Sequence, residues 1–144
     1  MTSITFYSHT DDRFHIAIKV CQKAIQKKIK VSILTTSKSE SKTMSDLLWS
    51  MPAPNFFPNC TSNSPIIELT PIMIDHEQIS IRQSGILINL TNEIPKCFST
   101  FERLIEIVDK KKEVQISARK RFKFYKDRGY FINNYQMNIK PEKQ

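Results

Sequence analysis

The residues of this chain with the most evident binding chemistry lie near its C-terminus. Between residues 110 and 128, nine Lys or Arg side chains stand against two carboxylates, Glu113 and Asp127, so this segment carries +7 of the formal net charge of +8. Guanidinium and ammonium groups bind carboxylates and phosphates through charge-assisted hydrogen bonds. Because the rest of the chain is almost neutral, this concentration of charge predicts a binding surface for an anion rather than only a solvated helix face.

The spacing within this basic segment predicts an amphipathic helix. One face is apolar and suited to packing on the body of the protein: Val114, Ala118, Phe122 and Tyr125. The adjacent face is cationic: Arg119, Lys123 and Lys126. Both sets recur every three or four residues, which is the period of an α-helix, and Gly129 stands where a left-handed residue would end it. A rigid guanidinium beside aromatic rings can receive a carboxylate, a phosphate or an acidic peptide.

Composition limits the class of protein. At 144 residues, with 40 % hydrophobic and 25 % charged residues, the chain is long enough for one domain with one core. It contains two glycines, Gly85 and Gly129, whereas phosphate-cradling loops and dinucleotide fingerprints need several, so both are excluded. No apolar run reaches the roughly 18 residues of a membrane-spanning helix, and the N-terminus lacks a signal-peptide pattern, so we expect a cytoplasmic protein.

The sequence shows no residue spacing typical of a catalytic or metal site. The cysteines and histidines are scattered: Cys21, Cys60, Cys97, His9, His15 and His76. They match neither a disulfide framework nor a paired metal motif, so we expect no metal, no cofactor, and a binding module rather than an enzyme. His9 keeps a candidate role because it follows the first expected strand, and open α/β sheets bind ligands beyond the carboxyl ends of their strands.

The N-terminal third of the chain predicts a βαβ unit. Residues 3–8 are β-branched and aromatic, as in a strand, and Thr10 has the position of a helix N-cap. The helix runs to about residue 28 and residues 30–35 form the next strand. A strand, a helix and a strand in about thirty residues require parallel pairing with a right-handed crossover.

Three later segments predict further strands: residues 65–69, 85–90 and 104–108. The last could also end a helix, but its β-branched content favours a strand. The apolar run at residues 85–90 is typical of a central strand in a sheet covered on both faces, which makes the fold α/β with a mostly parallel sheet of about five strands. We expect one domain over residues 1–130 and a loosely ordered tail over residues 131–144.

A proline-rich loop with aromatic side chains follows a short second helix, which begins with the capping-box spacing of Ser37 and Glu40. The aromatic and proline residues of interest are Trp49, Phe56, Phe57 and Pro58. Trp and Phe on a loop stiffened by proline are effective interface anchors. The same side chains could instead fold back over the core, and the sequence of this loop favours that second interpretation.

Five short stretches occur in a characteristic order along the chain. They are Thr5-Phe6-Tyr7; Leu48-Trp49 with Pro52 and Phe56-Phe57-Pro58; Leu87-Ile88-Asn89-Leu90; Ile105-Glu106-Ile107-Val108-Asp109; and Ala118-Arg119-Lys120-Arg121-Phe122-Lys123-Phe124-Tyr125 with Gly129-Tyr130. Together they resemble the chi subunit of bacterial DNA polymerase III holoenzyme, over nearly the whole chain to about Tyr130. Two positions depart from the family pattern: Gln115 replaces a lysine that some members have one turn before Arg119, and Asn59 replaces a histidine.

The resemblance implies a Rossmann-like three-layer sandwich and a monomeric, non-catalytic accessory subunit that works at replication forks. The family's chi binds the psi subunit, which attaches it to the clamp loader. On a separate face it binds the acidic C-terminal tail of single-stranded DNA-binding protein, and so contacts nucleic acid indirectly. By this resemblance, the psi surface contains Trp49, Phe56, Phe57 and Pro58. The tail pocket contains Arg119, Phe122, Lys123, Tyr125 and Gly129.

Two functions from other classes remain open. A basic helix with interleaved aromatic residues is also typical of proteins that bind single-stranded nucleic acid directly, and such binding weakens steeply with salt. A small hydrolase or transferase would need a histidine at the end of a strand, which only His9 supplies.

Overall fold

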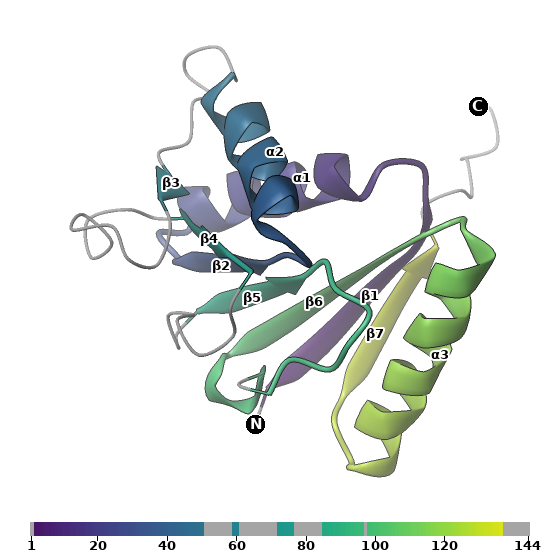
Figure 1. Ribbon diagram of the computed structural model, residues 1–144. Coiled ribbons are helices and arrows are strands. Elements are labelled where there is room, and N and C mark those ends of the chain that lie inside the picture. The colour runs from purple at the N-terminus through teal and green to yellow at the C-terminus, as the bar shows by residue number, and fades with distance from the viewer. Residues whose placement is uncertain (1, 51–58, 61–71, 77–84, 97, 137–144) are drawn as a thin grey trace, which may run out of the picture.

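One parallel β-sheet with helices on both faces forms the framework of the computed structural model (Figure 1). The structure describes residues 2–50, 59–60, 72–76, 85–96 and 98–136. The strands are β1 (Ser3–Thr10), β2 (Val31–Leu34), β3 (Asn59–Cys60), β4 (Ile72–Asp75), β5 (Ile86–Asn89), β6 (Arg103–Asp109) and β7 (Ile132–Gln136). The helices are α1 (Arg13–Gln26), α2 (Lys38–Trp49), α3 (Lys112–Asp127) and the short 3-10 helix η3 (Phe98–Thr100).

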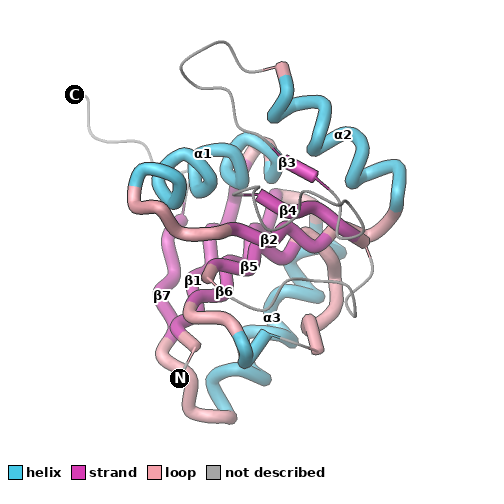
Figure 2. The backbone as a smooth tube through the Cα atoms, turned by 90° about the vertical axis from the view of Figure 1, so that its left-hand side faces the viewer, coloured by secondary structure: helices cyan, strands magenta, loops and turns pink. Residues whose placement is uncertain are grey.

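The strand order is β3-β4-β2-β5-β6-β1-β7, and every pairing among these strands is parallel. Helices α1 and α2 lie on one face of the sheet and α3 lies on the other, which gives three layers (Figure 1 and Figure 2). The expected Rossmann-like three-layer α/β sandwich with a mostly parallel sheet is confirmed. The described sheet has seven strands, where about five were expected.

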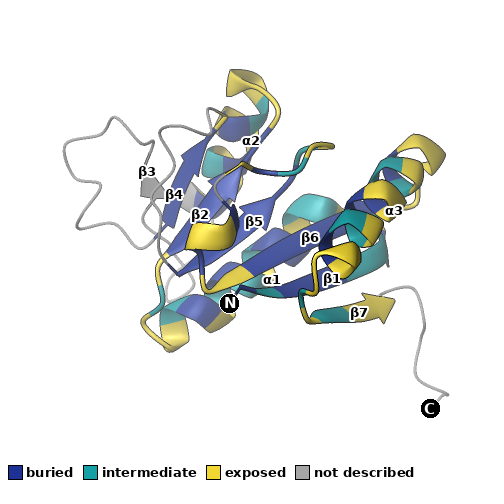
Figure 3. Cartoon of the chain, turned by 90° about the horizontal axis from the view of Figure 1, so that it is seen from below, coloured by how far each residue is buried: buried dark blue, intermediate teal, exposed yellow. Residues whose placement is uncertain are grey.

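Successive residues of the central strands pack into two separate apolar cores. Ile86 and Ile88 of β5 pack with Cys21 of α1 on one face of the sheet, and Leu87 packs with Tyr125 of α3 on the other. Neighbouring side chains of a strand point to opposite faces, so a strand covered on both sides is apolar throughout. Figure 3 shows the result, with buried central strands lying between helices whose outer surfaces are exposed.

Local hydrogen bonds define where the first two helices begin. The Asp12 carboxylate accepts from Phe14 N at 3.0 Å and caps α1, so the expected cap at Thr10 is wrong. Thr10 instead ends β1, and its hydroxyl donates to the Val108 carbonyl. Helix α2 begins as expected, because Glu40 N donates to Ser37 Oγ at 3.1 Å.

The first βαβ unit is parallel, but its two strands are not neighbours. β5 and β6 lie between β1 and β2, so the predicted direct pairing is wrong. Among the later strands, β5 and β6 confirm the predictions for residues 85–90 and 104–108. The expected strand at residues 65–69 lies outside the described residues, and β4 was not predicted because its apolar run is only three residues long.

The segment after α3 differs most from expectation. Residues 131–144 were expected to form a loose tail, but β7 pairs in parallel with β1 along the edge of the sheet, from Ile4↔Ile132 to Ser8↔Gln136. Tyr135 stacks on Tyr7 with ring centroids 5.6 Å apart. The domain therefore extends to Gln136, and the predicted boundary at residue 130 is wrong for these residues.

Several features relevant to function are absent from the described part of the chain. No helix there is long and apolar enough to cross a membrane. The same described residues contain no cluster of three or more His, Cys, Asp or Glu side chains arranged to hold a metal ion. Cys21 is a buried core thiol, and burial raises its pKa to about 12, which makes it unreactive.

Candidate functional site

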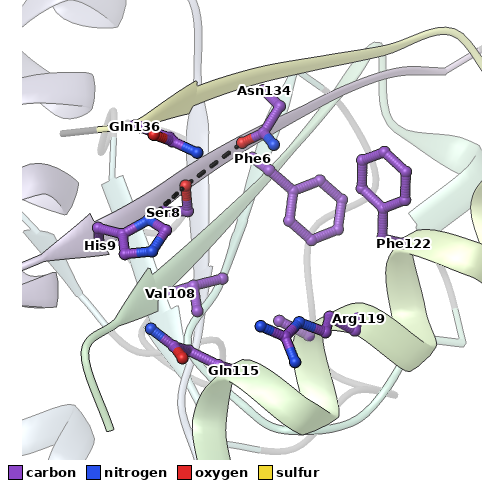
Figure 4. A pocket seen from close by; sticks show the side chains of 10 residues that line it. Phe6, Ser8, His9, Val108, Gln115, Arg119, Phe122, Asn134 and Gln136 are labelled. Atoms are coloured by element: carbon purple, nitrogen blue, oxygen red, sulfur yellow. Dashed lines mark hydrogen bonds between the residues drawn. The ribbon is translucent and has the colours of Figure 1, made fainter. Parts of the chain in front are cut away.

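A pocket of about 330 Å³ lies between α3 and the carboxyl-terminal parts of β1, β6 and β7 (Figure 4). Its apolar lining consists of Phe6, Val108, Ala118 and Phe122. Its polar lining consists of Ser8, His9, Gln115, Arg119, Asn134 and Gln136. Three sheet strands, of which β1 is far from the other two in the sequence, meet one face of α3 here, and ligands of open α/β sheets commonly bind at such strand ends.

The apolar side of the pocket is built from two phenylalanines. The rings of Phe6 on β1 and Phe122 on α3 lie 5.3 Å apart between centroids, with a tilt of 59°. Phe6 is buried, whereas Phe122 is half-buried and contributes to the pocket wall. Tilted aromatic pairs of this kind are stable and rigid. They provide a preformed slot for an apolar or aromatic group of a ligand.

The charged side of the pocket is Arg119. Its guanidinium lies beside the aromatic slot in Figure 4, and no carboxylate pairs with it in the part of the chain that the structure describes. Two nearby cations have other contacts: Lys123 Nζ of α3 lies 3.7 Å from Asp127 Oδ2, and the guanidinium of Arg128, directly after α3, lies 4.4 Å from the Phe124 ring centroid. Arg119 is therefore the cation best placed to bind an anion in the pocket.

A different arginine of α3 has a structural contact. Arg121 is buried, and its Nε donates to Glu106 Oε1 of β6 at 3.2 Å. The Tyr125 hydroxyl donates to Glu106 Oε2 at 2.7 Å, and Asn89 Nδ2 of β5 donates to the same carboxylate at 3.0 and 3.1 Å. These bonds fix α3 on the sheet, because three donors from two elements converge on one carboxylate.

Burial also sets the protonation of this network. Burial raises the pKa of Glu106, and the Arg121 charge with the hydrogen bonds from Tyr125, Asn89 and Arg121 opposes that rise. Burial, followed by the neighbouring Glu106 carboxylate, raises the pKa of Tyr125, so its hydroxyl remains a hydrogen-bond donor. The network gives α3 a fixed position, and with it the position of Arg119 in the pocket.

Comparison with known proteins identifies the family. The family model described as "DNA polymerase III chi subunit, HolC" matches residues 1–133. The chain belongs to the DNA polymerase III chi family. The expected resemblance is confirmed, and as a chi subunit the chain is a non-catalytic accessory subunit of DNA polymerase III.

Two curated chi proteins show the extent of the similarity. The chain is 23 % identical over 141 residues to the DNA polymerase III subunit chi of Pseudomonas aeruginosa, covering 95 % of this chain and 98 % of that one. It is 28 % identical over 105 residues to the subunit chi of Haemophilus influenzae, covering 72 % of this chain and 73 % of that one. The first of these alignments spans both proteins almost completely.

The structure brings two of the five residues expected at the tail site of this chi chain into one pocket, namely Arg119 and Phe122. Lys123 is exposed and paired with Asp127. Tyr125 is completely buried and does not line the pocket. Its contribution is indirect, because its hydrogen bond to Glu106 holds α3 on the sheet. Gly129 follows α3 with a φ of +85°, in the left-handed region that glycine adopts readily. Apart from its chain neighbours, no described residue has an atom within 4 Å of where its Cβ would be.

The residues expected at the psi surface fall mostly outside the described residues. This is so for Phe56, Phe57 and Pro58. Trp49 is the last residue of α2, on the face of the sheet opposite α3. Its backbone position is described, and its role remains a prediction.

Several pocket residues were not predicted from the sequence, including Phe6, Ser8 and Val108. They lie in strands that alternate between two buried faces, and strand alternation alone does not show which face adjoins α3. Asn134 and Gln136 were missed because β7 was taken for a tail. The position of His9 at the end of a strand did signal a ligand site, and His9 lines the pocket.

Proposed function

We propose that this chi subunit links the psi subunit of the clamp loader to the acidic C-terminal tail of single-stranded DNA-binding protein. The observation that supports the tail site is Arg119 beside the Phe6 and Phe122 slot, without a carboxylate partner among the described residues. A chain terminus that ends in an aromatic residue presents a carboxylate and a ring together. One bidentate cation and one apolar slot match those two groups.

The positions of α2 and α3 support a linking function. The helices lie on opposite faces of the sheet (Figure 2), and Trp49 ends the first whereas Arg119 is carried by the second. Two partners bound at these places would not compete for one surface. A contact with one aromatic anchor and a few charge-assisted bonds has a dissociation constant on the order of micromolar.

The proposed tail contact can be tested with purified proteins. Immobilised single-stranded DNA-binding protein should retain the chi chain, and a form that lacks only the acidic C-terminal tail should lose it. Both forms should bind single-stranded DNA equally, which controls for folding. Equal retention by the two forms would contradict the proposed function.

Direct binding to single-stranded nucleic acid is the second candidate. Exposed cations on α3 favour it: Lys112, Lys120 and Lys126. Nucleic-acid binding through such residues would weaken with salt, with a slope of about −0.7 per phosphate contact on logarithmic axes, and would not require Arg119 specifically. An oligonucleotide titration at several salt concentrations separates this candidate from the peptide site.

Replacing Trp49 by alanine is expected to weaken psi binding by about 30-fold, because truncation of an aromatic interface anchor typically costs about 2 kcal/mol. The acidic-peptide affinity should not change, since α2 and α3 lie on opposite faces. Co-purification of psi with the variant, compared with wild type, measures the effect. If psi is retained as strongly as before, Trp49 belongs to the core instead.

A lysine in place of Gln115 is expected to tighten binding of an acidic peptide about threefold at low salt. Gln115 lines the pocket one turn before Arg119, so the new ammonium would add a second cation there. Ile116→Lys is the matched control, because it adds the same charge at an exposed neighbouring position that does not line the pocket. Equal gains from both variants would show that general charge, and not the pocket, controls affinity.

A further inference from the structure

A β-bulge near the end of β1 directs two consecutive side chains into the pocket. Tyr7 pairs with Ile107 and Thr10 pairs with Asp109, so Ser8 and His9 together oppose the single residue Val108. Neighbouring side chains of a regular strand point to opposite faces. The bulge interrupts this alternation, so the side chains of both Ser8 and His9 line the pocket.

The backbone of His9 has an unusual conformation. Its φ is +59°, in the left-handed region that non-glycine residues rarely adopt. Such conformations cost free energy and cluster at functional sites. Here the conformation accompanies the bulge and places the imidazole on the pocket wall that Arg119 does not occupy (Figure 4). His9 Nδ1 lies 3.3 Å from Ser8 Oγ, so Nε2 is the nitrogen that we assign to a ligand.

The groups that face His9 from the other elements include no carboxylate among the described residues. Helix α3 contributes the Arg119 cation and the neutral Gln115, β6 contributes Val108, and β7 contributes two neutral amides, those of Asn134 and Gln136. The Asp11 carboxylate, which directly follows β1, lies 2.6 Å from Lys110 Nζ, and Asp11 does not line the pocket. A protonated His9 imidazole therefore has no counter-charge among these groups, and an anion that enters the pocket would supply one.

We propose that His9 and Ser8 form a second carboxylate subsite across the pocket from Arg119. It receives a side-chain carboxylate of an acidic peptide whose terminal carboxylate is held by Arg119. The inference rests on the proposed function, since it concerns the same acidic tail. It extends that function by assigning a separate contact to the acidic residues that precede the terminus, and by making capture dependent on pH.

The sign of the pH dependence follows from linkage. A histidine ordinarily changes charge between pH 5 and 8. A bound carboxylate favours the protonated imidazole, so binding takes up a proton and affinity rises as pH falls through this range. Aspartate and the terminal carboxylate remain largely ionised above about pH 5, so the ligand contributes little to this slope.

The test is a calorimetric titration of the whole chain with a short poly-aspartate peptide that ends in phenylalanine with a free carboxylate. Wild type should bind it about fivefold more tightly at about pH 5.5 than at about pH 8. His9→Asn should abolish this dependence, and asparagine tolerates the left-handed backbone at this position. His15→Asn, on the exposed surface of α1, should behave as wild type.

A second measurement separates a direct contact from a structural effect. The His9 ring, observed by NMR, should titrate at higher pH when the peptide is bound, and should not do so with a peptide whose aspartates are replaced by asparagine. A pH dependence that survives His9→Asn, or an unchanged ring titration, would overturn the subsite while leaving Arg119 and the proposed function intact. Absence of peptide binding at every pH would overturn both.

Discussion

Replacement of Arg119 by alanine is expected to weaken binding of an acidic, phenylalanine-ending peptide by about 30-fold, equivalent to about 2 kcal/mol. The variant loses the cation that lies beside the Phe6 and Phe122 slot without a carboxylate partner among the described residues. Fold and psi binding should be unaffected, because the Arg119 side chain is exposed and Arg121 carries the buried contact with the sheet.

Two further variants make this measurement specific. Lys120→Ala removes the same charge from the adjacent exposed position, which does not line the pocket, and should change the affinity little. Arg119→Lys keeps the charge but loses the planar, bidentate donor, so its affinity should lie between those of wild type and Arg119→Ala. Equal effects of Arg119→Ala and Lys120→Ala would place the peptide elsewhere on the helix.

The second large effect is on stability. Glu106→Ala is expected to lower the free energy of unfolding by about 3 to 5 kcal/mol, because it leaves the buried Arg121 guanidinium without its counter-charge. It also removes the acceptor of the Tyr125 hydroxyl and of the Asn89 amide. Because these bonds hold α3 on β5 and β6, any folded fraction should also bind the acidic peptide less tightly.

Urea denaturation, monitored by circular dichroism, measures the expected decrease in the free energy of unfolding of Glu106→Ala. Glu102→Ala is the matched control, since Glu102 is exposed and immediately precedes β6. Replacing Glu106 and Arg121 together by methionine should cost less than Glu106→Ala alone, because removing both charges leaves none buried and unpaired. A loss in Glu106→Ala no greater than that of the control would show that the network contributes little to stability.

The elements that could be predicted from sequence are those with a strong local period. Helix α3 repeats its apolar face every three or four residues from Val114 to Tyr125, β5 is apolar enough to be recognised as a central strand, and the β-branched content of β6 favoured a strand. The capping pair Ser37 and Glu40 located the start of α2. In each case the signal lies within the segment itself, so no knowledge of its neighbours was needed.

The features that escaped prediction depend on neighbours distant in sequence. β7 is polar and lies at the sheet edge, where pairing with β1 and stacking of Tyr135 on Tyr7 replace an apolar pattern. The strand order could not be derived, because β1 and β2 are separated by strands that come later in the chain. The face of the sheet that His9 lines shows the same limit, because the β-bulge that directs its side chain to the α3 face depends on pairing with β6.

Two arginines of α3 have different structural roles that the charge pattern of the sequence does not distinguish. Arg119 and Arg121 belong to the same basic run, yet one lines a pocket and the other is buried. The signal for the buried pair was present in the sequence, because Glu106 is the one charged residue within the apolar run of residues 104–108. A carboxylate in a strand covered on both faces requires a buried partner. Arg121, on the following helix, supplies it.

The measurement that tests the central claim most directly is NMR mapping of the acidic peptide on the isotope-labelled chain. Shift changes should concentrate on the amides of Phe6, Ser8, Arg119 and Phe122, which line the pocket on β1 and α3. They should largely disappear when the peptide's terminal carboxylate is converted to an amide. Changes that spread over the exposed cations of α3, or that persist with the amidated peptide, would contradict the account.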